Sequence, residues 1–370
     1  MRVLFAGGGT GGHVYPALAI AKYLLKQDNN TEILFIGTKV GMESKIIPKE
    51  GFAFETITVQ GLERKISLGM FKTGFKAIEG LGKSISILRK YNPQLVIGTG
   101  GYVCGPVVLA ARILGIPTII HEQNALPGMT NKLLGKIVDQ IMITFPDSDK
   151  YFKKNKVKLT GLPVREQILD IKKEEGIKFL NLDSTKKTIL ITGGSRGAKN
   201  INNAMACAYK DLLKKNNLQF IHITGESGYK DVLNNLIQQG INLEEQGNII
   251  LKPYLYEMEY AISCADLCIS RAGATFLAEM TAKGIPSILI PYPFASENHQ
   301  EYNAKSLVNR NAAMMILDKD LSGEKLLNNI LSIIDNDSLL SQMTSSAKKA
   351  GNVDSLENIM QVIVELTDYQ

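Results

Sequence analysis

Short, wholly apolar runs alternate along the chain with longer stretches in which apolar residues recur at helical spacing. The runs predict β-strands at residues 3–6, 33–36, 95–97, 118–120, 189–192, 220–224, 267–270 and 287–290. Because these runs are apolar throughout rather than alternating with polar residues, we expect helices to cover both faces of each sheet. The repeated order of strand and helix therefore predicts an α/β protein built from doubly wound parallel sheets.

A glycine-rich turn follows the first predicted strand and is echoed half a chain length later. Residues 7–12 read GGGTGG, and residues 193–197 read GGSRG directly after another predicted strand. Each half of the chain thus opens with a strand, a glycine turn and a helix, which predicts two Rossmann-like domains in tandem. Glycine and proline interrupt the periodic pattern at 161–164, so we predict domains spanning 1–163 and 164–351.

Composition and charge indicate a globular protein and make a nucleic-acid-binding or membrane-spanning protein an unexpected class. The chain is 45% hydrophobic and 21% charged, which is typical of a folded globular protein. Its net charge of +6 comes without tryptophan and without basic runs interleaved with aromatic residues, so we expect no nucleic-acid partner. The four cysteines are scattered and fit buried structural residues. Neither an apolar signal-peptide core nor a membrane-spanning run occurs in the sequence, which favours a cytoplasmic protein with peripheral membrane contact at most.

The first glycine turn allows more than one chemistry. Gly7, Gly9 and Gly12 satisfy the GxGxxG spacing of a nicotinamide-dependent dehydrogenase, which is weak evidence alone. That class needs a carboxylate at the end of the second strand, and residues 35–38 contain none. His13 follows the turn directly, where an imidazole suggests proton transfer or contact with a ligand oxygen. A purely structural role for this histidine remains open.

Polar residues also follow other predicted strands. A second glycine cluster occupies residues 98–106, the sequence HEQN occupies 121–124, and SRAGAT occupies 270–275. Ligands bind at the carboxyl ends of strands in open α/β sheets, so these segments are candidate binding loops. Arg271 and a helix N-terminus would favour a diphosphate, and Glu279 could accept hydrogen bonds from ribose hydroxyls.

Taken in order, the motifs of the chain resemble those of the MurG family of glycosyltransferases. They are GGGTGGHVYPALA at 7–19, GTGGYVCGP at 98–106, HEQN at 121–124, GLPVR at 161–165, GGSRGA at 193–198 and RAGATFLAE at 271–279. The resemblance covers nearly the whole chain. It implies a GT-B fold, in which two Rossmann-like domains face each other across a cleft and a C-terminal helix at about 352–370 packs back on the first. It also implies transfer of N-acetylglucosamine from UDP-GlcNAc to an undecaprenyl-linked muramyl-peptide, lipid I, which gives lipid II.

The same resemblance assigns site residues. Those implied for the UDP-GlcNAc donor are Thr10, Gly11, Gly12, Asn124, Arg165, Ser195, Leu255, Ala274, Thr275, Glu279 and Gln300. Among them, Glu279 would bind the ribose, Ser195 a phosphate and the backbone of Leu255 the uracil. Gly100, Gly101 and Tyr102 would form a loop for the acceptor and its diphosphate. Leu162, Phe276 and Ala278 depart from the family pattern, which affects fine contacts with the donor.

The implied reaction inverts the anomeric carbon in one displacement, so a base must take the proton of the acceptor hydroxyl. His13 is the first candidate for this base and Glu122 the second.

We expect no obligatory metal cofactor. Residues 147–149 have the DxD pattern of metal-dependent transferases, but the pattern recurs at 318–320 and 335–337 and is therefore weak. Helix N-termini and Arg165 could instead stabilise the charge of the leaving group.

A basic amphipathic helix is predicted at 68–91. Its apolar residues at helical spacing are Phe71, Phe75, Ile78, Ile85 and Leu88, and its basic residues include Lys72, Lys76, Lys83, Arg89 and Lys90. The pattern fits contact with anionic lipids of the inner leaflet, and it also fits an ordinary packed helix with a solvated face. With the resemblance, it predicts a peripheral protein at the cytoplasmic face of the membrane, with cell-wall synthesis proteins as possible partners.

The sequence leaves three alternative functions open besides the disfavoured dehydrogenase: a UDP-GlcNAc epimerase on the same fold, another GT-B transferase, and a non-catalytic uridine-nucleotide sensor.

Overall fold

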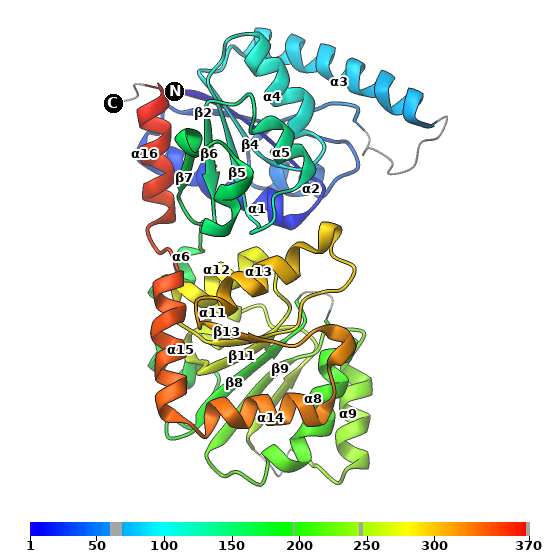
Figure 1. The fold of residues 1–370 in the computed structure, drawn as a ribbon, viewed down its shortest axis with the longest axis vertical. Helices are drawn as coiled ribbons and strands as arrows, with labels where there is room; N and C mark the ends of the chain where they lie inside the picture. The colour runs from blue at the N-terminus through cyan, green and yellow to red at the C-terminus, as the bar shows by residue number, and fades with distance from the viewer. Residues whose placement is uncertain (60–68, 195–196, 244–246, 368–370) are drawn as a thin grey trace. The chain divides into compact units, whose positions relative to one another are not determined.

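The computed structural model describes residues 1–59, 69–194, 197–243 and 247–367, with side chains described in these ranges except at 69–77. The chain divides into two compact units (Figure 1). Unit 1 comprises Met1–Pro163 together with Asp354–Gln370, and unit 2 comprises Val164–Val353. The boundary thus falls between Pro163 and Val164, in the segment where glycine and proline interrupt the sequence pattern.

Unit 1 is built on a seven-stranded parallel sheet with the strand order β3-β2-β1-β4-β5-β6-β7. Its strands are β1 (Arg2–Gly7), β2 (Glu32–Gly37), β3 (Ala53–Thr56), β4 (Leu95–Gly100), β5 (Thr118–Glu122), β6 (Gln140–Ile143) and β7 (Val157–Leu159). The central strands β1, β4 and β5 are buried except at Arg2, as their solid apolar runs predict.

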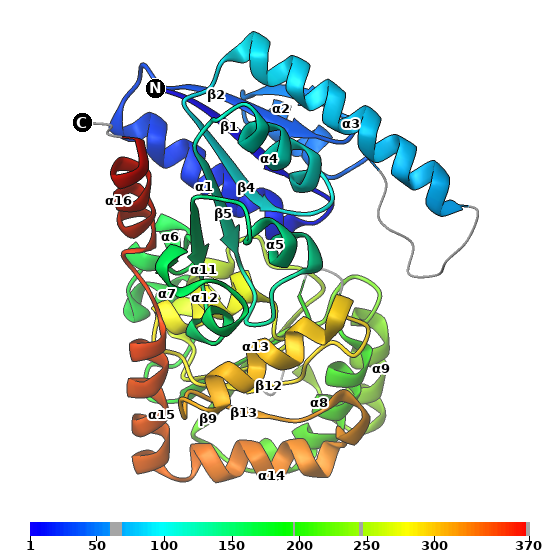
Figure 2. The ribbon, with the colours of Figure 1, turned by 45° about the horizontal axis from the view of Figure 1, so that its top comes forward.

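Helices cover both faces of this sheet. They are α1 (Gly11–Gln27), α2 (Glu43–Lys49), α3 (Gly69–Tyr91), α4 (Cys104–Ile113), α5 (Met129–Leu134) and α16 (Ser355–Thr367), with short 3₁₀ turns at Pro146–Tyr151 and Lys154–Lys156. Helices α1, α2 and α16 share one hydrophobic core with the sheet, and α3, α4 and α5 share the other. The C-terminal helix α16 therefore belongs to unit 1, where it packs beside α1 (Figure 2).

Unit 2 repeats the plan with a six-stranded parallel sheet of order β10-β9-β8-β11-β12-β13. Its strands are β8 (Lys187–Thr192), β9 (Leu218–Ile223), β10 (Ile249–Lys252), β11 (Leu267–Ser270), β12 (Ser287–Leu289) and β13 (Ala313–Met315). Its helices are α6 (Glu166–Asp170), α7 (Lys173–Phe179), α8 (Lys199–Leu212), α9 (Tyr229–Gln238), α11 (Met258–Cys264), α12 (Ala274–Ala282), α13 (His299–Val308), α14 (Gly323–Ile334) and α15 (Asp337–Ala350), with 3₁₀ turns at Ser296–Asn298 and Asp318–Asp320.

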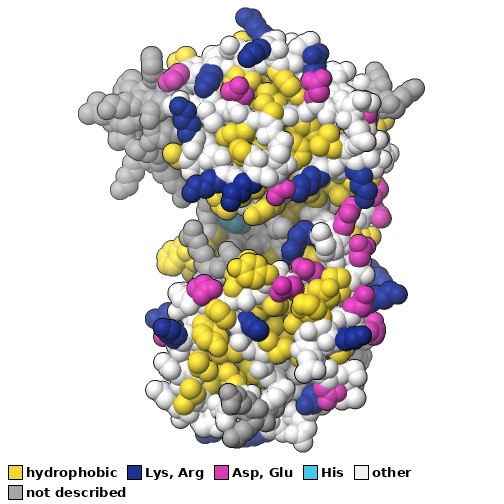
Figure 3. Space-filling view, turned by 180° about the vertical axis from the view of Figure 1, so that it is seen from behind, with side chains coloured by type: hydrophobic (Ala, Val, Ile, Leu, Met, Phe, Trp, Pro, Cys, Tyr) yellow, Lys and Arg dark blue, Asp and Glu magenta, His cyan; other side chains and the backbone are white. Residues whose placement is uncertain are grey.

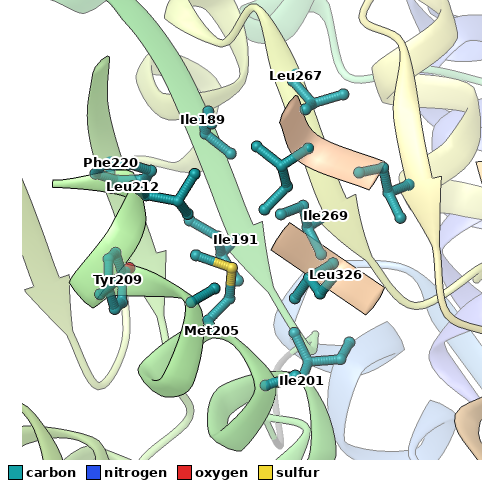
Figure 4. Close-up of a cluster of buried hydrophobic side chains, with 14 of the residues drawn as sticks. Ile189, Ile191, Ile201, Met205, Tyr209, Leu212, Phe220, Leu267, Ile269 and Leu326 are labelled. Carbon is teal, nitrogen blue, oxygen red and sulfur yellow. The ribbon is translucent and has the colours of Figure 1, made fainter. Parts of the chain in front are cut away.

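Two cores also sandwich the sheet of unit 2. One face packs on α8, α9 and α14, and the other on α6, α7, α11 and α12. Figure 4 shows the first core, in which Ile191 and Ile269 from neighbouring strands meet Met205 of α8 and Leu326 of α14. All four side chains are fully buried.

The strand order fixes where loops can form a site. In each sheet the first strand of the unit lies between the second and the fourth, so the order reverses beside it. The turns that follow β1 and β4 in unit 1, and β8 and β11 in unit 2, therefore emerge side by side at the carboxyl edge. Such a switch point is where open α/β sheets bind ligands.

Every strand predicted from an apolar run is present in the structure. The strands that the sequence did not reveal are β3, β6, β7, β10 and β13, which are short and lie at or next to the edges of their sheets. The edge strands β3 and β7 contain no solid apolar run, as exposed edges allow, whereas β6, β10 and β13 contain short apolar runs that cannot be distinguished by pattern from buried helical segments.

Candidate active site

His13 lies in the first turn of α1, directly after the glycine turn that follows β1. Its Nδ1 is 2.9 Å from the carbonyl oxygen of Gly8. A carbonyl oxygen can only accept a hydrogen bond, so Nδ1 carries the hydrogen and, in the neutral ring, Nε2 carries the lone pair. The ring is partly exposed. The Thr10 hydroxyl lies farther from the same Nδ1, at 3.3 Å, so the shorter contact with Gly8 favours the tautomer of a base whose reactive nitrogen is Nε2.

The second glycine cluster packs directly against this turn. A Cβ atom at Gly100 would lie 2.7 Å from Cδ2 of His13, and one at Gly101 would lie 2.4 Å from the oxygen of Gly8. The hydroxyl of Thr99 also donates to the carbonyl of His13 at 2.9 Å. Glycine is needed at both positions because any side chain would displace the histidine or its carbonyl partner. Tyr102, next in the loop, is 60% exposed.

The remaining residues expected at this edge lie at the start of α1. Thr10 precedes the helix in an extended conformation and its side chain does not cap it. Gly11 and Gly12 begin the helix, and Thr10 and Gly12 are exposed. The N-terminus of α1 is thus open on the same edge as His13.

Glu43, the first residue of α2, was not found by the sequence reasoning. Its carboxylate is buried and accepts hydrogen bonds from the backbone N–H groups of Gly9 and Thr38, each at 2.9 Å, and from the Thr38 hydroxyl at 2.8 Å. Burial would raise the pKa of Glu43, but these bonds outweigh it and hold the pKa below its usual value. Glu43 thus places a carboxylate near the end of β2, where a nicotinamide-dependent dehydrogenase would bind the ribose. Donors of the protein enclose this carboxylate, so it is not available to a ribose.

Three of the four polar residues at 121–124 are buried. Burial lowers the pKa of His121 to about 4, so its ring is neutral. Glu122 is 2% exposed, and its carboxylate accepts from the backbone N–H of Asn124 at 2.9 Å and from the side-chain amide of Asn131 at 2.8 Å. Burial raises the pKa of Glu122, and these bonds work against the rise. Glu122 thus holds the loop that presents the partly exposed Asn124.

In unit 2 the N-terminus of α12 forms the corresponding edge. Gly273 precedes the helix without a capping side chain, and the first intrahelical bond is the one from Leu277 N–H to the Gly273 carbonyl. The N–H groups of Ala274 and Thr275 therefore lie in the first turn, where they have no acceptor within the helix and where an anion is stabilised. Ser195, expected at a phosphate, lies outside the described residues.

Arg165 and Glu279 form an ion pair at this edge of unit 2. Nε of Arg165 donates to Glu279 at 2.8 Å, and Glu259 lies 3.7 Å from the same guanidinium. The Glu279 side chain is 8% exposed and that of Arg165 is 49% exposed. Burial raises the pKa of Glu279, and the cation opposes this rise. The arginine expected near phosphates is thus joined to the acid expected at the ribose.

Gln300 links the loop that follows β11 to the loop that follows β12, at the carboxyl edge of the sheet of unit 2. Its side-chain oxygen accepts from the N–H groups of Ala272 at 3.1 Å and Tyr292 at 3.0 Å, which leaves the amide N–H groups as its means of binding a ligand. Leu255 buries its side chain in the core beside α11, between the exposed Tyr254 and Tyr256.

Arg271, which the sequence suggested for a diphosphate, is paired within the protein. Its guanidinium donates to Asp318 at 2.5 Å and to the carbonyl of Ile290 at 3.2 Å, and the side chain is 13% exposed. The protein itself therefore satisfies this cation. Because Asp318 is the partner, the DxD-like sequence at 318–320 has a structural explanation. In the described part of the chain, no group of three or more His, Cys, Asp or Glu side chains is arranged to hold a metal ion.

The predicted helix at 68–91 is present as α3. Its described part is amphipathic, because Leu88 is fully buried, Ile85 packs on the core beside α4, and Ile78 is 70% exposed. Phe71 and Phe75 fall among the side chains that are not described. Within the described residues, no helix is both long and apolar enough to cross a bilayer.

Tandem doubly wound units with glycine turns at their switch points have the architecture of a GT-B glycosyltransferase, and this confirms the predicted fold class of two parallel-sheet α/β domains. Residues 3–143 match the N-terminal domain of glycosyltransferase family 28, and residues 188–359 match its C-terminal domain. The chain belongs to this family.

Relatives extend over the full length of the chain. It is 49% identical over 100% of both chains to the UDP-N-acetylglucosamine–N-acetylmuramyl-(pentapeptide) pyrophosphoryl-undecaprenol N-acetylglucosamine transferase of Desulforamulus reducens. A transferase of the same name from Thermoanaerobacter sp. is 50% identical, covering 99% of this chain and 100% of that protein. The recognised resemblance to the MurG family is thereby confirmed.

Solved structures agree on the fold. The crystal structure of Acinetobacter baumannii MurG has a TM-score of 0.79 at 29% identity, over 98% of this chain and 99% of that one. A UDP-GlcNAc 2-epimerase from Neisseria meningitidis bound to UDP-GlcNAc has a TM-score of 0.69 at 16% identity, over 99% and 100%. The second likeness concerns the fold alone.

Proposed function

We propose that this protein transfers N-acetylglucosamine from UDP-GlcNAc to the 4-hydroxyl of the muramyl sugar in lipid I, which gives lipid II for peptidoglycan synthesis. The observation that carries the proposal is the identity of about half of all residues, over the full chain, with transferases named for this reaction. The epimerase alternative has only a shared fold in its favour.

Unit 2 binds the donor in this proposal. The open N-terminus of α12 offers the N–H groups of Ala274 and Thr275 and a partial positive charge to the diphosphate. Arg165 occupies one oxygen of Glu279, and the other oxygen can accept from a ribose hydroxyl. The amide of Gln300 contacts the sugar, and the backbone at Leu255 contacts the uracil. Ser195 completes the phosphate contacts.

Unit 1 supplies the base. Nε2 of His13 takes the proton from the muramyl 4-hydroxyl as that oxygen attacks the anomeric carbon, and the bond from this carbon to the phosphate oxygen breaks. The hydrogen bond from Nδ1 to the Gly8 carbonyl persists and stabilises the imidazolium that forms. Glu122, enclosed by donors, acts as the support of the Asn124 loop instead. Thr10, Gly11, Gly12 and Asn124 line the path of the donor sugar.

The charge of the departing UDP is stabilised without an obligatory metal. Fixed N–H groups at a helix N-terminus can stabilise developing negative charge without reorganising during the reaction. The loop of Gly100, Gly101 and Tyr102 lies at the edge that holds His13 and binds the acceptor near its diphosphate.

Membrane contact is part of the proposal because the acceptor carries a lipid. Exposed apolar side chains gather on α4 and near α5, which pack against each other: Leu109, Ile113, Leu133 and Ile137. Lys136, which precedes Ile137, is exposed, as are Lys83, Arg89 and Lys90 of α3, the helix that packs on α4. On the face drawn in Figure 3, basic side chains are interspersed with acidic ones. This surface of unit 1 binds the anionic inner leaflet peripherally, at the cytoplasmic face.

A transfer assay tests the proposal. The protein is incubated with radiolabelled UDP-GlcNAc and a short-chain analogue of lipid I, and the expected product is the labelled disaccharide lipid. Incubation with UDP-GlcNAc alone is the companion reaction. Formation of an epimer there, without transfer in the complete mixture, would overturn the proposal. Sedimentation with phosphatidylglycerol vesicles, compared with phosphatidylcholine vesicles, tests the contact with anionic lipid.

A further inference from the structure

A single peptide group joins Glu43 to His13. The peptide bond between Gly8 and Gly9 donates its N–H to the Glu43 carboxylate at 2.9 Å, and its carbonyl oxygen accepts from Nδ1 of His13 at 2.9 Å. Carboxylate, peptide and imidazole therefore form one continuous chain of hydrogen bonds. Each bond polarises the next, because a peptide group whose N–H faces a negative charge has a more negative oxygen.

From this geometry we infer that Glu43 is a positioning residue, which orients His13 through the Gly8–Gly9 peptide and keeps its hydrogen on Nδ1. The inference rests on the proposed role of His13 as the base. Glu43 does not touch the substrate, since its side chain is 1% exposed. Its action resembles that of a carboxylate bonded directly to a histidine, with one peptide group inserted between them.

The glycines around Glu43 show that the site is built for this carboxylate. A Cβ atom would lie 2.4 Å from Oε1 of Glu43 if placed on Gly8, and 2.4 Å from its Cγ if placed on Gly37. At Gly41 a Cβ would lie 2.1 Å from both carboxylate oxygens. Three glycines that lie apart in the sequence thus make room for one side chain. The glycine-rich sequence of the first turn is explained in part by an internal anion rather than by a bound phosphate.

Both oxygens of the carboxylate are required. Oε2 accepts from Gly9, while Oε1 accepts from the N–H and hydroxyl of Thr38. Glutamine is almost the same size but has only one carbonyl oxygen, so it can serve Gly9 or the backbone of Thr38 and not both. Glu43→Gln also removes the negative charge that polarises the peptide. This substitution is therefore a sharp test that leaves packing nearly unchanged.

The direct measurement is the tautomer of His13 by long-range ¹H–¹⁵N correlation of the imidazole rings. The chain has four histidines, so the spectrum is simple, and His13→Gln assigns the signal. At a pH where His13 is neutral, the wild-type ring should carry its hydrogen on Nδ1, and in Glu43→Gln the Nε2–H tautomer should gain population. His121, buried in unit 1 with Nε2 at 2.9 Å from the Gly161 carbonyl, should be unchanged and reports that the unit remains folded.

Kinetics supply the second measurement. In Glu43→Gln, kcat should fall about tenfold with the KM for UDP-GlcNAc unchanged, because the donor is bound by unit 2. Glu50→Gln is the matched control: Glu50 caps the same helix and pairs with Lys22 at the surface, so tautomer and kcat should both stay at wild-type values.

Three results separate the inference from the proposed function. A wild-type His13 with its hydrogen on Nε2 overturns the inference, and this result requires no variant to fold. An unchanged tautomer in folded Glu43→Gln also overturns it, even if the protein transfers sugar. If the tautomer depends on Glu43 but the wild type makes no product in the transfer assay, the orientation of His13 by Glu43 stands and the proposed function fails.

Discussion

The switch-point edges of the two units share a topology and differ in how their backbone donors are used. In unit 1 the glycine turn gives the N–H of Gly9 to the buried carboxylate of Glu43. In unit 2 the first turn of α12 begins after Gly273 with no capping side chain. Both α1 and α12 begin without a capping side chain, but in the turn before α1 a buried carboxylate of the protein already takes one backbone donor. The comparison shows that a strand, a glycine turn and a helix can use their backbone donors to hold an anion of the protein itself, and not only a bound phosphate.

Replacement of His13, the proposed base of unit 1, should have the largest effect on activity. We expect His13→Gln to lower kcat about 10²- to 10⁴-fold, because it removes the base from the edge that binds the acceptor. The affinity for UDP-GlcNAc, measured by calorimetry, should be unchanged because the nucleotide belongs to unit 2. Wild-type turnover in this variant would mean that the assignment of the base is wrong.

Replacement of Glu279 tests the proposed binding of UDP by unit 2. Glu279→Gln should weaken UDP binding about 10- to 100-fold, since it removes a charged acceptor for the ribose and the nearer of the two carboxylates beside Arg165. Glu324→Gln, in the exposed first turn of α14, is the matched control and should bind UDP as the wild type does. Equal affinity of the two variants would remove Glu279 from the donor site.

The role of the ion pair between Arg165 and Glu279 can be tested by measuring the UDP affinity of Arg165→Ala over a range of pH. Burial already raises the pKa of Glu279, and loss of the cation should raise it further. The carboxylate then takes up a proton at higher pH, so UDP affinity should fall at a higher pH than in the wild type as the solution is acidified. We expect a several-fold difference in dissociation constant on the acid side. Parallel curves for the two proteins would show that Arg165 does not control the ionisation of Glu279.

The smallest expected effect concerns metals. Addition of EDTA to the transfer assay should change the rate by less than about twofold, because helix dipoles and fixed donors stabilise the leaving group. A large loss of activity that Mg²⁺ restores would contradict this part of the account.

Much of the fold was predictable because buried parallel strands leave solid apolar runs in the sequence. The glycine turns could be located as well, since each follows such a run. What the turns bind was not predictable, because the deciding contacts join distant positions. Gly9 meets Glu43 across 34 residues, and Arg271 meets Asp318 across 47. Neither contact was foreseen, since sequence spacing carries no information about either pair.

For the polar segment at 121–124, the sequence predicted the location but not the contacts of each residue, because these contacts also join residues that are apart in the sequence. The sequence located it correctly at the carboxyl end of a buried strand, which is β5. It could not distinguish a residue that faces a ligand from one that holds the loop. Glu122 is enclosed by donors from Asn124 and Asn131, and this depends on the path of the chain after the strand.

The most direct test of the account is a crystal structure of the protein with UDP-GlcNAc bound. The nucleotide is expected in unit 2, with its diphosphate at the N-terminus of α12 and its ribose within hydrogen-bonding distance of Glu279. The first glycine turn of unit 1 should retain its bond between Gly9 and Glu43 and hold no phosphate. A uridine diphosphate bound at residues 7–12, or away from Glu279, would contradict the account.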